Sequence, residues 1–258
     1  MRSLLKRPAY WFYERHLQAR LNGMTRPRHI GIVMDGNRRW ARQMGLVPSV
    51  GHRYGGEHID NVLAWSAEQG VTHVTIFVAS TDNLLKRPTD QISHLLTVVE
   101  DVTDRLSRPE STWQVHIAGR LDSLPDTTRH ALKLAEERTR ARTTGMHVTF
   151  AIGYGGREEV VDALRSLLDE EAAAGADLRD VAERITDQRI AAHLYTAGHP
   201  DPDLIIRTSG EQRLSGFLLW QSAHSELYFC DTYWPAFRKV DFLRALRAYA
   251  TRDRRYGR

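Results

Sequence analysis

Three segments that lie far apart in the chain combine isolated acids with arginines and small polar residues. Asp35 opens the segment Asp35-Gly-Asn-Arg-Arg-Trp40, and Glu226 precedes a short apolar run. Between them, the segment 204–215 carries Arg207 and Arg213. Carboxylates hold hard cations, and the planar guanidinium group of arginine forms paired hydrogen bonds with phosphate oxygens. The pattern therefore predicts a site for a metal ion and a diphosphate.

Composition restricts the class of protein. The chain has 258 residues, of which 26% are charged and 41% hydrophobic, as is usual for a soluble globular protein. Its one cysteine, Cys230, excludes an internal disulfide and favours a reducing compartment, so we expect a cytoplasmic protein. No apolar run is long enough to predict a transmembrane helix.

The charge balance is basic, with a formal net charge of +4 and a pI of about 9.3. A basic protein invites nucleic acid as a partner. The arginines are nevertheless spread along the chain among acids, and only residues 252–258 are densely basic. We therefore expect small anionic substrates, which a positive cleft attracts, and no nucleic acid.

Apolar patterning predicts an α/β fold. Segments with the length and β-branched content of strands are Ile30–Met34, Val74–Ala79, Val115–Ala118, Val148–Ile152, Leu204–Ile206 and Leu227–Phe229. Helical patterns are Tyr54–Gln69, Gln91–Leu106, Asp126–Arg142, Arg157–Ala174 and Val240–Ala250. This alternation predicts a mainly parallel central sheet flanked by helices. With no repeat or linker in the sequence, residues 1–258 are expected to form a single domain.

Residues 1–27 are expected to form an amino-terminal helical extension. Residues 1–21 mix basic side chains with four consecutive aromatic residues, Tyr10 to Tyr13, and lack the apolar core of a signal peptide. The favoured interpretation is an amphipathic helix that docks on the domain. The alternative is a peripheral membrane contact.

Polar segments follow four of the predicted strands directly. They are Asp35, Ser80–Asn83, Gly153–Gly156 and Arg207. In an open parallel sheet, ligands bind outside the carboxyl ends of the strands. The sequence therefore predicts that these groups lie on one rim of the sheet.

Each of these motifs also has a plainer interpretation. Asp35 or Asn37 could cap the helix that follows, and Ser80–Asn83 could form a simple turn after its strand. Gly153–Glu158 follows a strand, as a dinucleotide-binding loop does. That motif requires glycine or alanine where Glu158 stands, so dinucleotide binding is excluded.

In combination, these motifs identify a resemblance to a known family. Asp35-Gly-Asn-Arg-Arg-Trp40 after an apolar strand, with Arg207-Thr-Ser-Gly-Glu-Gln-Arg-Leu-Ser215 before Phe217-Leu-Leu-Trp-Gln221, resembles the cis-prenyltransferases, the undecaprenyl diphosphate synthase family. The resemblance runs from about Arg28 to the end of the chain. Ser209–Ser222 and Trp234-Pro-Ala-Phe-Arg238 are most similar to the short-chain actinobacterial Z-farnesyl diphosphate synthases.

The resemblance implies an α/β fold with an apolar tunnel, and condensation of isopentenyl diphosphate with an allylic diphosphate, expected to be geranyl diphosphate. It implies that Mg²⁺ is bound by Asp35 and Glu226, and that Asp35 assists departure of the leaving group. It places Asn83 and Ser80 beside the reacting isopentenyl group. The remaining substrate-binding positions that it implies are Gly36, Asn37, Arg38, Arg39, Trp40, His52, Thr81, Asp82, Arg207, Arg213, Leu214 and Ser215.

The resemblance also implies a homodimer in which Arg255 reaches the diphosphate site of the partner subunit. Two departures from the family pattern affect the site. Pro48 stands where an arginine is frequent, so that Arg42 or Arg53 would have to compensate. The arginine expected after Asn83 aligns with either Lys86 or Arg87.

Product length depends on the tunnel. Val78 stands where long-chain members have alanine, and its side chain could face either the tunnel or a helix layer. The resemblance favours a fifteen-carbon product, (2Z,6E)-farnesyl diphosphate. The alternatives are a medium- or long-chain polyprenyl diphosphate synthase, or a non-catalytic α/β protein that binds phosphate or nucleic acid.

Overall fold

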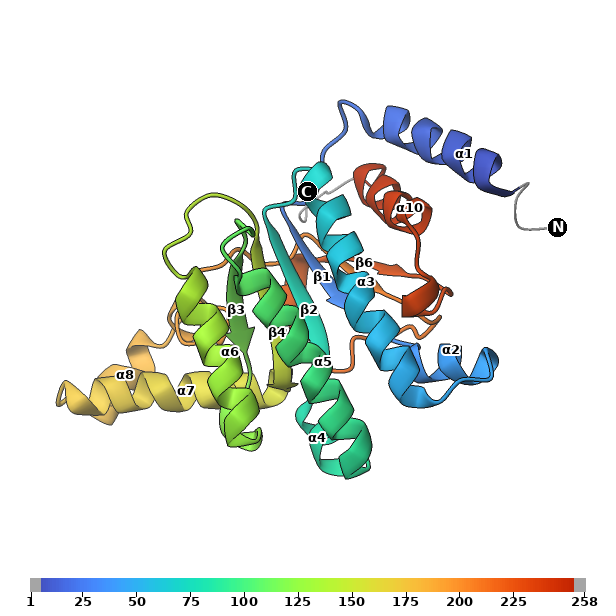
Figure 1. The fold of residues 1–258 in the computed structure, drawn as a ribbon. Helices are drawn as coiled ribbons and strands as arrows, with labels where there is room; N and C mark the ends of the chain where they lie inside the picture. Colours follow the sequence, from blue (N-terminus) through green and yellow to red (C-terminus); the bar gives the residue numbers. More distant parts are fainter. Residues whose placement is uncertain (1–5, 253–258) are drawn as a thin grey trace.

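Six parallel strands form the central sheet of the computed structural model, which describes residues 6–252 (Figure 1). The strands are β1 His29–Val33, β2 His73–Ser80, β3 Gln114–Ala118, β4 His147–Tyr154, β5 Leu204–Arg207 and β6 Glu226–Phe229. Their order is β3-β4-β2-β1-β5-β6. All six predicted strands are confirmed, with ends that differ by at most two residues.

Helices connect these strands. They are α1 Lys6–Leu21, α2 Asn37–Gln43, α3 Pro48–Glu68, α4 Thr81–Lys86, α5 Thr89–Ser107, α6 Asp126–Thr139, α7 Gly156–Ala173, α8 Leu178–Arg184, α9 Asp187–Ala191 and α10 Lys239–Ala250. Single 3₁₀ turns cover Leu121–Ser123, Gln221–His224 and Trp234–Ala236. The five predicted helices are confirmed. The first of them begins earlier than predicted, because Pro48 occupies its first turn, where a missing N–H costs nothing.

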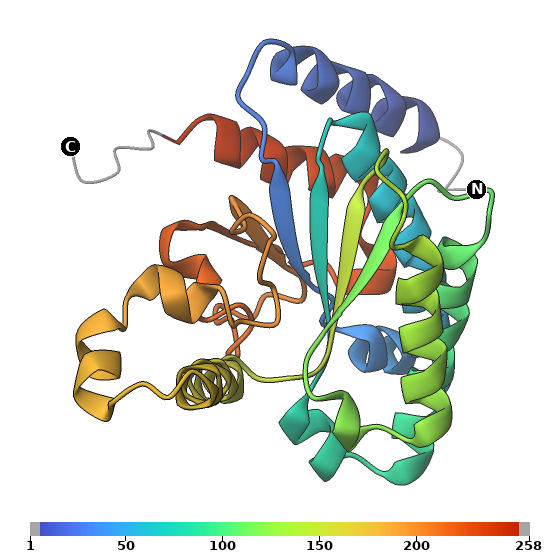
Figure 2. The same cartoon turned by 90° about the vertical axis from the view of Figure 1, so that its left-hand side faces the viewer.

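The helices cover both faces of the sheet, as predicted for parallel strands. Figure 2 shows α3, α5 and α6 on one side and α7 to α9 on the other. β1 is buried along its whole length between these layers. Ile32 packs with Leu63 and Phe150 in the larger core cluster, and Val33 packs with Phe217 in a second cluster.

The amino-terminal helix α1 docks beside α10 (Figures 1 and 2). Leu17 and Leu21 are fully buried, and Arg244 Nε donates a hydrogen bond of 3.4 Å to the Tyr13 hydroxyl. The favoured interpretation of this segment is therefore confirmed. Trp11 and Phe12 stay exposed, so a peripheral membrane contact remains a prediction. Within residues 6–252, no helix has the length and apolar character needed to cross a membrane.

The strand order brings the predicted polar segments together. β1 pairs with β2 on one side and with β5 on the other. The strands that follow in sequence are therefore added on both sides of β1, and the order of the strands reverses there. α/β proteins bind ligands at such a topological switch point. In Figure 1, α2 and α4 lie beyond the carboxyl ends of these strands.

Candidate active site

The Asp35 carboxylate lies just beyond β1 and is held by two arginines. Arg207, the last residue of β5, donates from Nη2 to Asp35 Oδ2 at 2.9 Å. Arg39 of α2 donates from Nη2 to Asp35 Oδ1 at 3.1 Å. The Thr208 hydroxyl donates to the backbone oxygen of Asp35 at 2.7 Å. Strand pairing and these hydrogen bonds fix the carboxylate between two cations.

This environment keeps Asp35 ionised. Burial by itself would raise the pKa of the carboxyl group, but the hydrogen bond from Arg207 and the charge of Arg39 outweigh it. The pKa of Asp35 therefore lies below its ordinary value. Arg207 is only 5% exposed, and its Nε has no hydrogen-bond partner among residues 6–252. A buried donor without a partner is available to a ligand.

Gly36 makes the turn into α2 possible. Its φ of 102° is in the left-handed region, and a Cβ atom there would lie 2.6 Å from Tyr233 Cδ1. Gly36 itself is the residue before the helix, and no side chain caps the helix start. The alternative in which Asp35 or Asn37 serves as a helix cap is therefore wrong.

Beside Asp35 lies a cleft of about 400 Å³ that carries excess positive charge. Its lining includes two acids, Asp35 and Glu211, and five arginines: Arg38, Arg39, Arg42, Arg87 and Arg213. Burial, followed by the charge of Arg38, lowers the pKa of Arg87 to about 10, so that Arg87 remains charged at neutral pH. An anion with several charges would relieve the repulsion between these arginines.

Glu211 orients two of these arginines. Its carboxylate accepts from Arg39 Nη1 at 3.1 Å and from Arg213 Nη1 at 2.5 Å. Ser209 Oγ accepts a third hydrogen bond from Arg39, at 2.7 Å. Sequence analysis did not predict a role for Ser209. Its place among the small polar residues of segment 204–215 is the feature that could have indicated one.

Asn37 and His52 lie where this cleft meets an apolar cavity, because both line each of them. Asn37 Oδ1 and His52 Nδ1 are buried and have no hydrogen-bond partner in the described part of the chain. Burial and the charges of Arg87 and Arg38 lower the pKa of His52 to about 4, so its ring is neutral at pH 7. These atoms can serve a ligand that enters from the cleft.

An apolar cavity of about 20 Å³ adjoins the cleft. Val78 and Phe150 of the sheet line it together with Leu95, Val99 and Val102 of α5. Val78 also packs in the adjacent core clusters, so it contacts both the cavity and the helix layer, and its role in a tunnel stays a prediction. Because the cavity holds about one water-sized sphere, a prenyl chain that enters it must displace side chains.

A second cleft, of about 570 Å³, lies beside the predicted segment Ser80–Asn83 and also includes Ser215. Ser80 Oγ accepts from Asn83 N at 3.0 Å and caps helix α4, which begins at Thr81, so the simpler interpretation of a turn after the strand is wrong. Thr81 donates to the Gly153 oxygen at 3.3 Å. A smaller cleft of about 150 Å³ joins the two regions, lined among others by Asp35, Asn83, Arg87, Arg207 and Ser215.

The structure decides two choices that the sequence left open. Arg87 lines the clefts, whereas Lys86 forms an exposed ion pair with Asp82. Arg42 lines the main cleft, whereas Arg53 is exposed beside a separate groove. Arg87 and Arg42 are therefore the arginines available to a ligand.

Two predicted substrate-binding residues lie outside these clefts. Trp40 packs against Tyr54, with ring centroids 5.3 Å apart. Leu214 packs against the apolar cluster that contains Phe217. Neither side chain lines a cleft that contains Asp35. Both residues are half-buried, and their part in substrate binding stays a prediction.

Glu226 is not brought to Asp35 within one chain. It is the first residue of β6, level with Leu204 and Ile30, and it forms an ion pair with Arg252. Asp35 lies five residues further along the strand direction, a rise of about 16 Å. The prediction that both acids hold one ion is therefore corrected for the single chain.

The family of the protein follows from comparison with known proteins. The family model for undecaprenyl diphosphate synthases matches residues 33–257. The chain belongs to the undecaprenyl diphosphate synthase family. The chain is 60% identical over 251 residues to an isoprenyl transferase of Streptomyces fradiae, covering 96% of this chain and 97% of that protein.

Two further relatives of this family are informative. The (2Z,6E)-farnesyl diphosphate synthase of Thermobifida fusca is 54% identical over 256 residues, with 99% of both chains covered. The crystal structure of lavandulyl diphosphate synthase from Lavandula x intermedia in complex with dimethylallyl diphosphate superposes with a TM-score of 0.82. It is 32% identical, with 90% of this chain and 98% of that chain covered. The family and fold predicted from the sequence are confirmed. Arg255, for which a cross-subunit role was predicted, lies outside the described residues.

Proposed function

We propose that the protein is a Mg²⁺-dependent cis-prenyltransferase that joins isopentenyl diphosphate to an allylic diphosphate with a new Z double bond. One observation carries the proposal: the ionised Asp35, held between Arg39 and Arg207, stands in a cationic cleft that adjoins an apolar cavity. A charged head and a hydrocarbon tail fit that combination. The names of the relatives from Streptomyces fradiae and Thermobifida fusca support it.

The arginines assist the bond-breaking step. The allylic C–O bond breaks as the new C–C bond forms, and negative charge accumulates on the departing diphosphate. Arg38, Arg39 and Arg87 are already in place around the cleft. Preorganised cations stabilise such a charge without any cost of reorganisation during the reaction.

The isopentenyl unit loses a proton from C2 to complete the new double bond. Asn83 lines the cleft that connects to Asp35, and its neutral amide is a poor base. We therefore assign to Asn83 the positioning of the isopentenyl group, supported by Ser80, and the proton passes to the diphosphate leaving group. Arg207, Arg213 and Ser215 bind the isopentenyl diphosphate.

The residues of the site fit Mg²⁺. Asp35 is ionised, its side chain is 29% exposed, and each carboxylate oxygen accepts one arginine hydrogen bond and so keeps a further lone pair. Mg²⁺ commonly binds one carboxylate together with substrate phosphates and water. When bound, Mg²⁺ supplies positive charge to the diphosphate that departs. Asp35 and the substrates would hold it.

A homodimer is part of the same proposal. β6 is an edge strand whose four residues are only half-buried, and exposed strand edges favour pairing or cover. Glu226 belongs to this strand and could reach a metal at Asp35 only from a second copy. A Glu226 ligand would therefore require the dimer. Sedimentation at micromolar concentration tests whether the dimer forms, and a monomer would exclude the Glu226 ligand.

We assign a fifteen-carbon product, made from geranyl diphosphate. Val78 supports a short product, because it lines the cavity at a position where the family resemblance places the smaller alanine in long-chain members. The farnesyl-type name of the relative from Thermobifida fusca supports the same assignment.

Incorporation of radiolabelled isopentenyl diphosphate tests the proposed reaction. With geranyl diphosphate and Mg²⁺, we expect labelled product that is lost when EDTA is added and restored by excess Mg²⁺. A protein that binds phosphate without catalysis would give no labelled product under any of these conditions. Activity that survives EDTA would contradict the proposed metal dependence and leave the transfer reaction standing.

A further inference from the structure

Five histidines gather at the other end of the sheet, beside the amino ends of the strands. His29, His73 and His147 are the first residues of β1, β2 and β4, and the parallel register sets them side by side. His116 comes from β3 and His199 from the loop that leads to β5. The substrate clefts lie at the opposite ends of these strands, so this cluster has no part in the proposed reaction.

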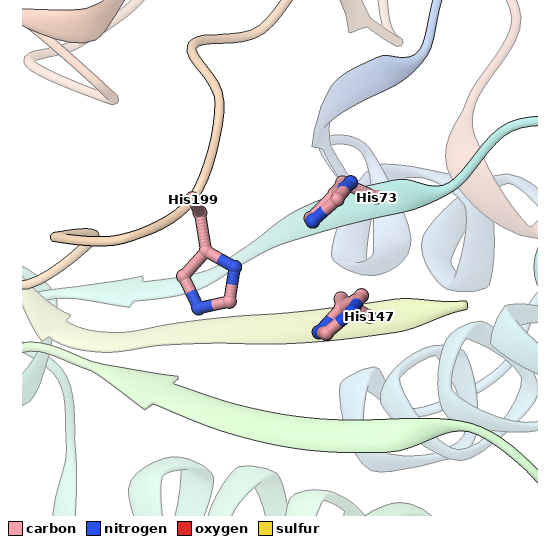
Figure 3. Close-up of side chains that lie close together, drawn as sticks. All are labelled: His73, His147 and His199. Carbon is pink, nitrogen blue, oxygen red and sulfur yellow. The ribbon is translucent and has the colours of Figure 1, made fainter. Parts of the chain in front are cut away.

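Three of these rings face a common point. Figure 3 shows His199 reaching from its loop toward His73 and His147. One ring nitrogen from each of the three lies within 4.8 Å of the others. The rings of His73 and His147 are stacked with centroids 4.5 Å apart. The ring of His199 stands edge-on to both, with its centroid 5.6 Å from that of His73 and 5.5 Å from that of His147. All three residues are half-buried, so that an ion can reach them.

Thr72 engages one nitrogen of His73. Its hydroxyl lies 2.9 Å from His73 Nδ1 and 3.1 Å from the Arg28 oxygen, which also accepts from the backbone N–H groups of Thr72 and His73. With Nδ1 engaged in this way, Nε2 is the ring nitrogen that can serve as a ligand. A hydrogen bond at one imidazole nitrogen that leaves the other as ligand is the usual arrangement in metal sites.

The two remaining histidines have different roles. His116 Nε2 lies 3.0 Å from His147 Nδ1, so the two share a hydrogen bond that orients the His147 ring. His29 is fully occupied, since it donates from Nδ1 to the Pro200 oxygen and contacts the Thr75 hydroxyl through Nε2. It therefore has no nitrogen to offer an ion.

We propose that His73, His147 and His199 bind a borderline transition-metal cation such as Zn²⁺, with water in the fourth position. Imidazole nitrogen suits Zn²⁺ at about 2.0–2.1 Å, whereas Mg²⁺ prefers oxygen, so the two ends of the sheet select different metals. Tetrahedral ligands lie about 3.3 Å apart, so the three rings must close in slightly. A bound ion would tie the loop before β5 to two strands of the sheet.

Co²⁺ absorption in the full-length protein tests this site. We expect one equivalent of Co²⁺ to give the intense visible bands of four-coordinate cobalt, in a buffer that already contains millimolar Mg²⁺. Zn²⁺ should displace the cobalt and raise the melting temperature. The Asp35→Asn variant should give the same spectrum, which separates this site from the substrate cleft. Weak, octahedral-type absorption in the wild-type protein would overturn the proposal.

Variants locate the ion. His199→Ala changes a loop residue, and it should weaken Zn²⁺ binding at least about 100-fold, because even loss of an outer partner costs about 10- to 100-fold. His116→Phe should weaken it about 10-fold. The control is His130→Ala, which removes an exposed imidazole from α6. If His199→Ala folds and keeps both the cobalt spectrum and wild-type Zn²⁺ affinity, the assignment is wrong. If His199→Ala unfolds, the proposal requires that His147→Gln lose Zn²⁺ affinity to the same extent.

Discussion

The two ends of the sheet are built from the same strands, yet they gather opposite kinds of side chain. At the carboxyl ends, Asp35 and Arg207 form an ion pair that holds both side chains in place. At the amino ends, His73 and His116 are kept neutral by burial and by the nearby rings of His147 and His199. The unlike charges suit the proposed hard cation and diphosphate, and the imidazoles suit the proposed borderline metal.

The two ends also differ in how the chain positions their residues. At the carboxyl ends, the functional side chains follow the strands, so turns such as the one at Gly36 decide where they point. At the amino ends, His29, His73 and His147 are strand residues, and register alone aligns them. The substrate site is consequently more sensitive to loop geometry, and the histidine cluster to strand order.

The largest expected effect is at Asp35. Asp35→Asn should lower kcat by about 100- to 1000-fold, since loss of one well-placed electrostatic group costs about 3 kcal/mol or more in the barrier. Steady-state kinetics and a melting curve measure it. The control Asp122→Asn changes a fully exposed carboxylate and should be silent. His199→Ala, at the other end of the sheet, should keep isoprenyl transfer. A near-normal kcat in Asp35→Asn would contradict the functional distinction between the two ends of the sheet.

A smaller effect is expected at the second substrate position. Arg207→Lys keeps the charge and loses the planar group that binds Asp35 and Ser215 and that we propose binds the substrate. We expect the KM for isopentenyl diphosphate to rise about tenfold or more, in line with about 1.5 kcal/mol for a charged hydrogen bond. Arg53→Lys, at an exposed position, is the control. A change confined to the KM of the allylic substrate would mean that the two diphosphate positions are reversed.

Val78 tests the cavity behind the charged end. Val78→Ala removes two methyl groups from the lining and should shift the product toward longer chains, at about 1–3 kcal/mol of stability. Val78→Phe should shorten or block elongation. Product chromatography and thermal unfolding give both quantities. An unchanged product with a lowered melting temperature would show that Val78 is only a core residue.

The smallest expected effect concerns His52, a neutral imidazole at the charged end. Its pKa is about 4 in the folded protein and about 6.5 when unfolded, so between these values the unfolded chain binds more protons. Stability contributed by His52 is thus complete above pH 6.5 and is lost as the pH falls toward 4. His52→Gln should flatten the dependence of unfolding free energy on pH by at most one proton, as measured by denaturant unfolding at several pH values. An unchanged slope in His52→Gln would contradict the neutral state of this ring.

Much of the charged end could be predicted from the sequence, because its motifs directly follow apolar strands. Asp35 and Arg207 meet as their strands imply. The separation of Glu226 from Asp35 could also have been predicted, because Glu226 precedes its predicted strand whereas Asp35 follows one. The family resemblance led us to place the two acids together. The direction of Trp40 depends on how α2 rotates against α3, which periodicity in so short a helix does not determine.

The histidine cluster could not be predicted, although its residues are plain in the sequence. His73 and His147 become neighbours only because β4 pairs with β2, and sequence order alone does not give that pairing. His199 joins them through a loop that has no regular pattern. Such a site is visible only when strand order is known.

Analysis of the products made from geranyl diphosphate tests the central assignment most directly. The purified protein, given isopentenyl diphosphate and Mg²⁺, should yield one principal product. After dephosphorylation, it should coelute with the fifteen-carbon alcohol that has the Z double bond at the newly formed position. A product with the E configuration there, a long polyprenyl chain, or no product at all would contradict the account of a narrow cavity behind a diphosphate site.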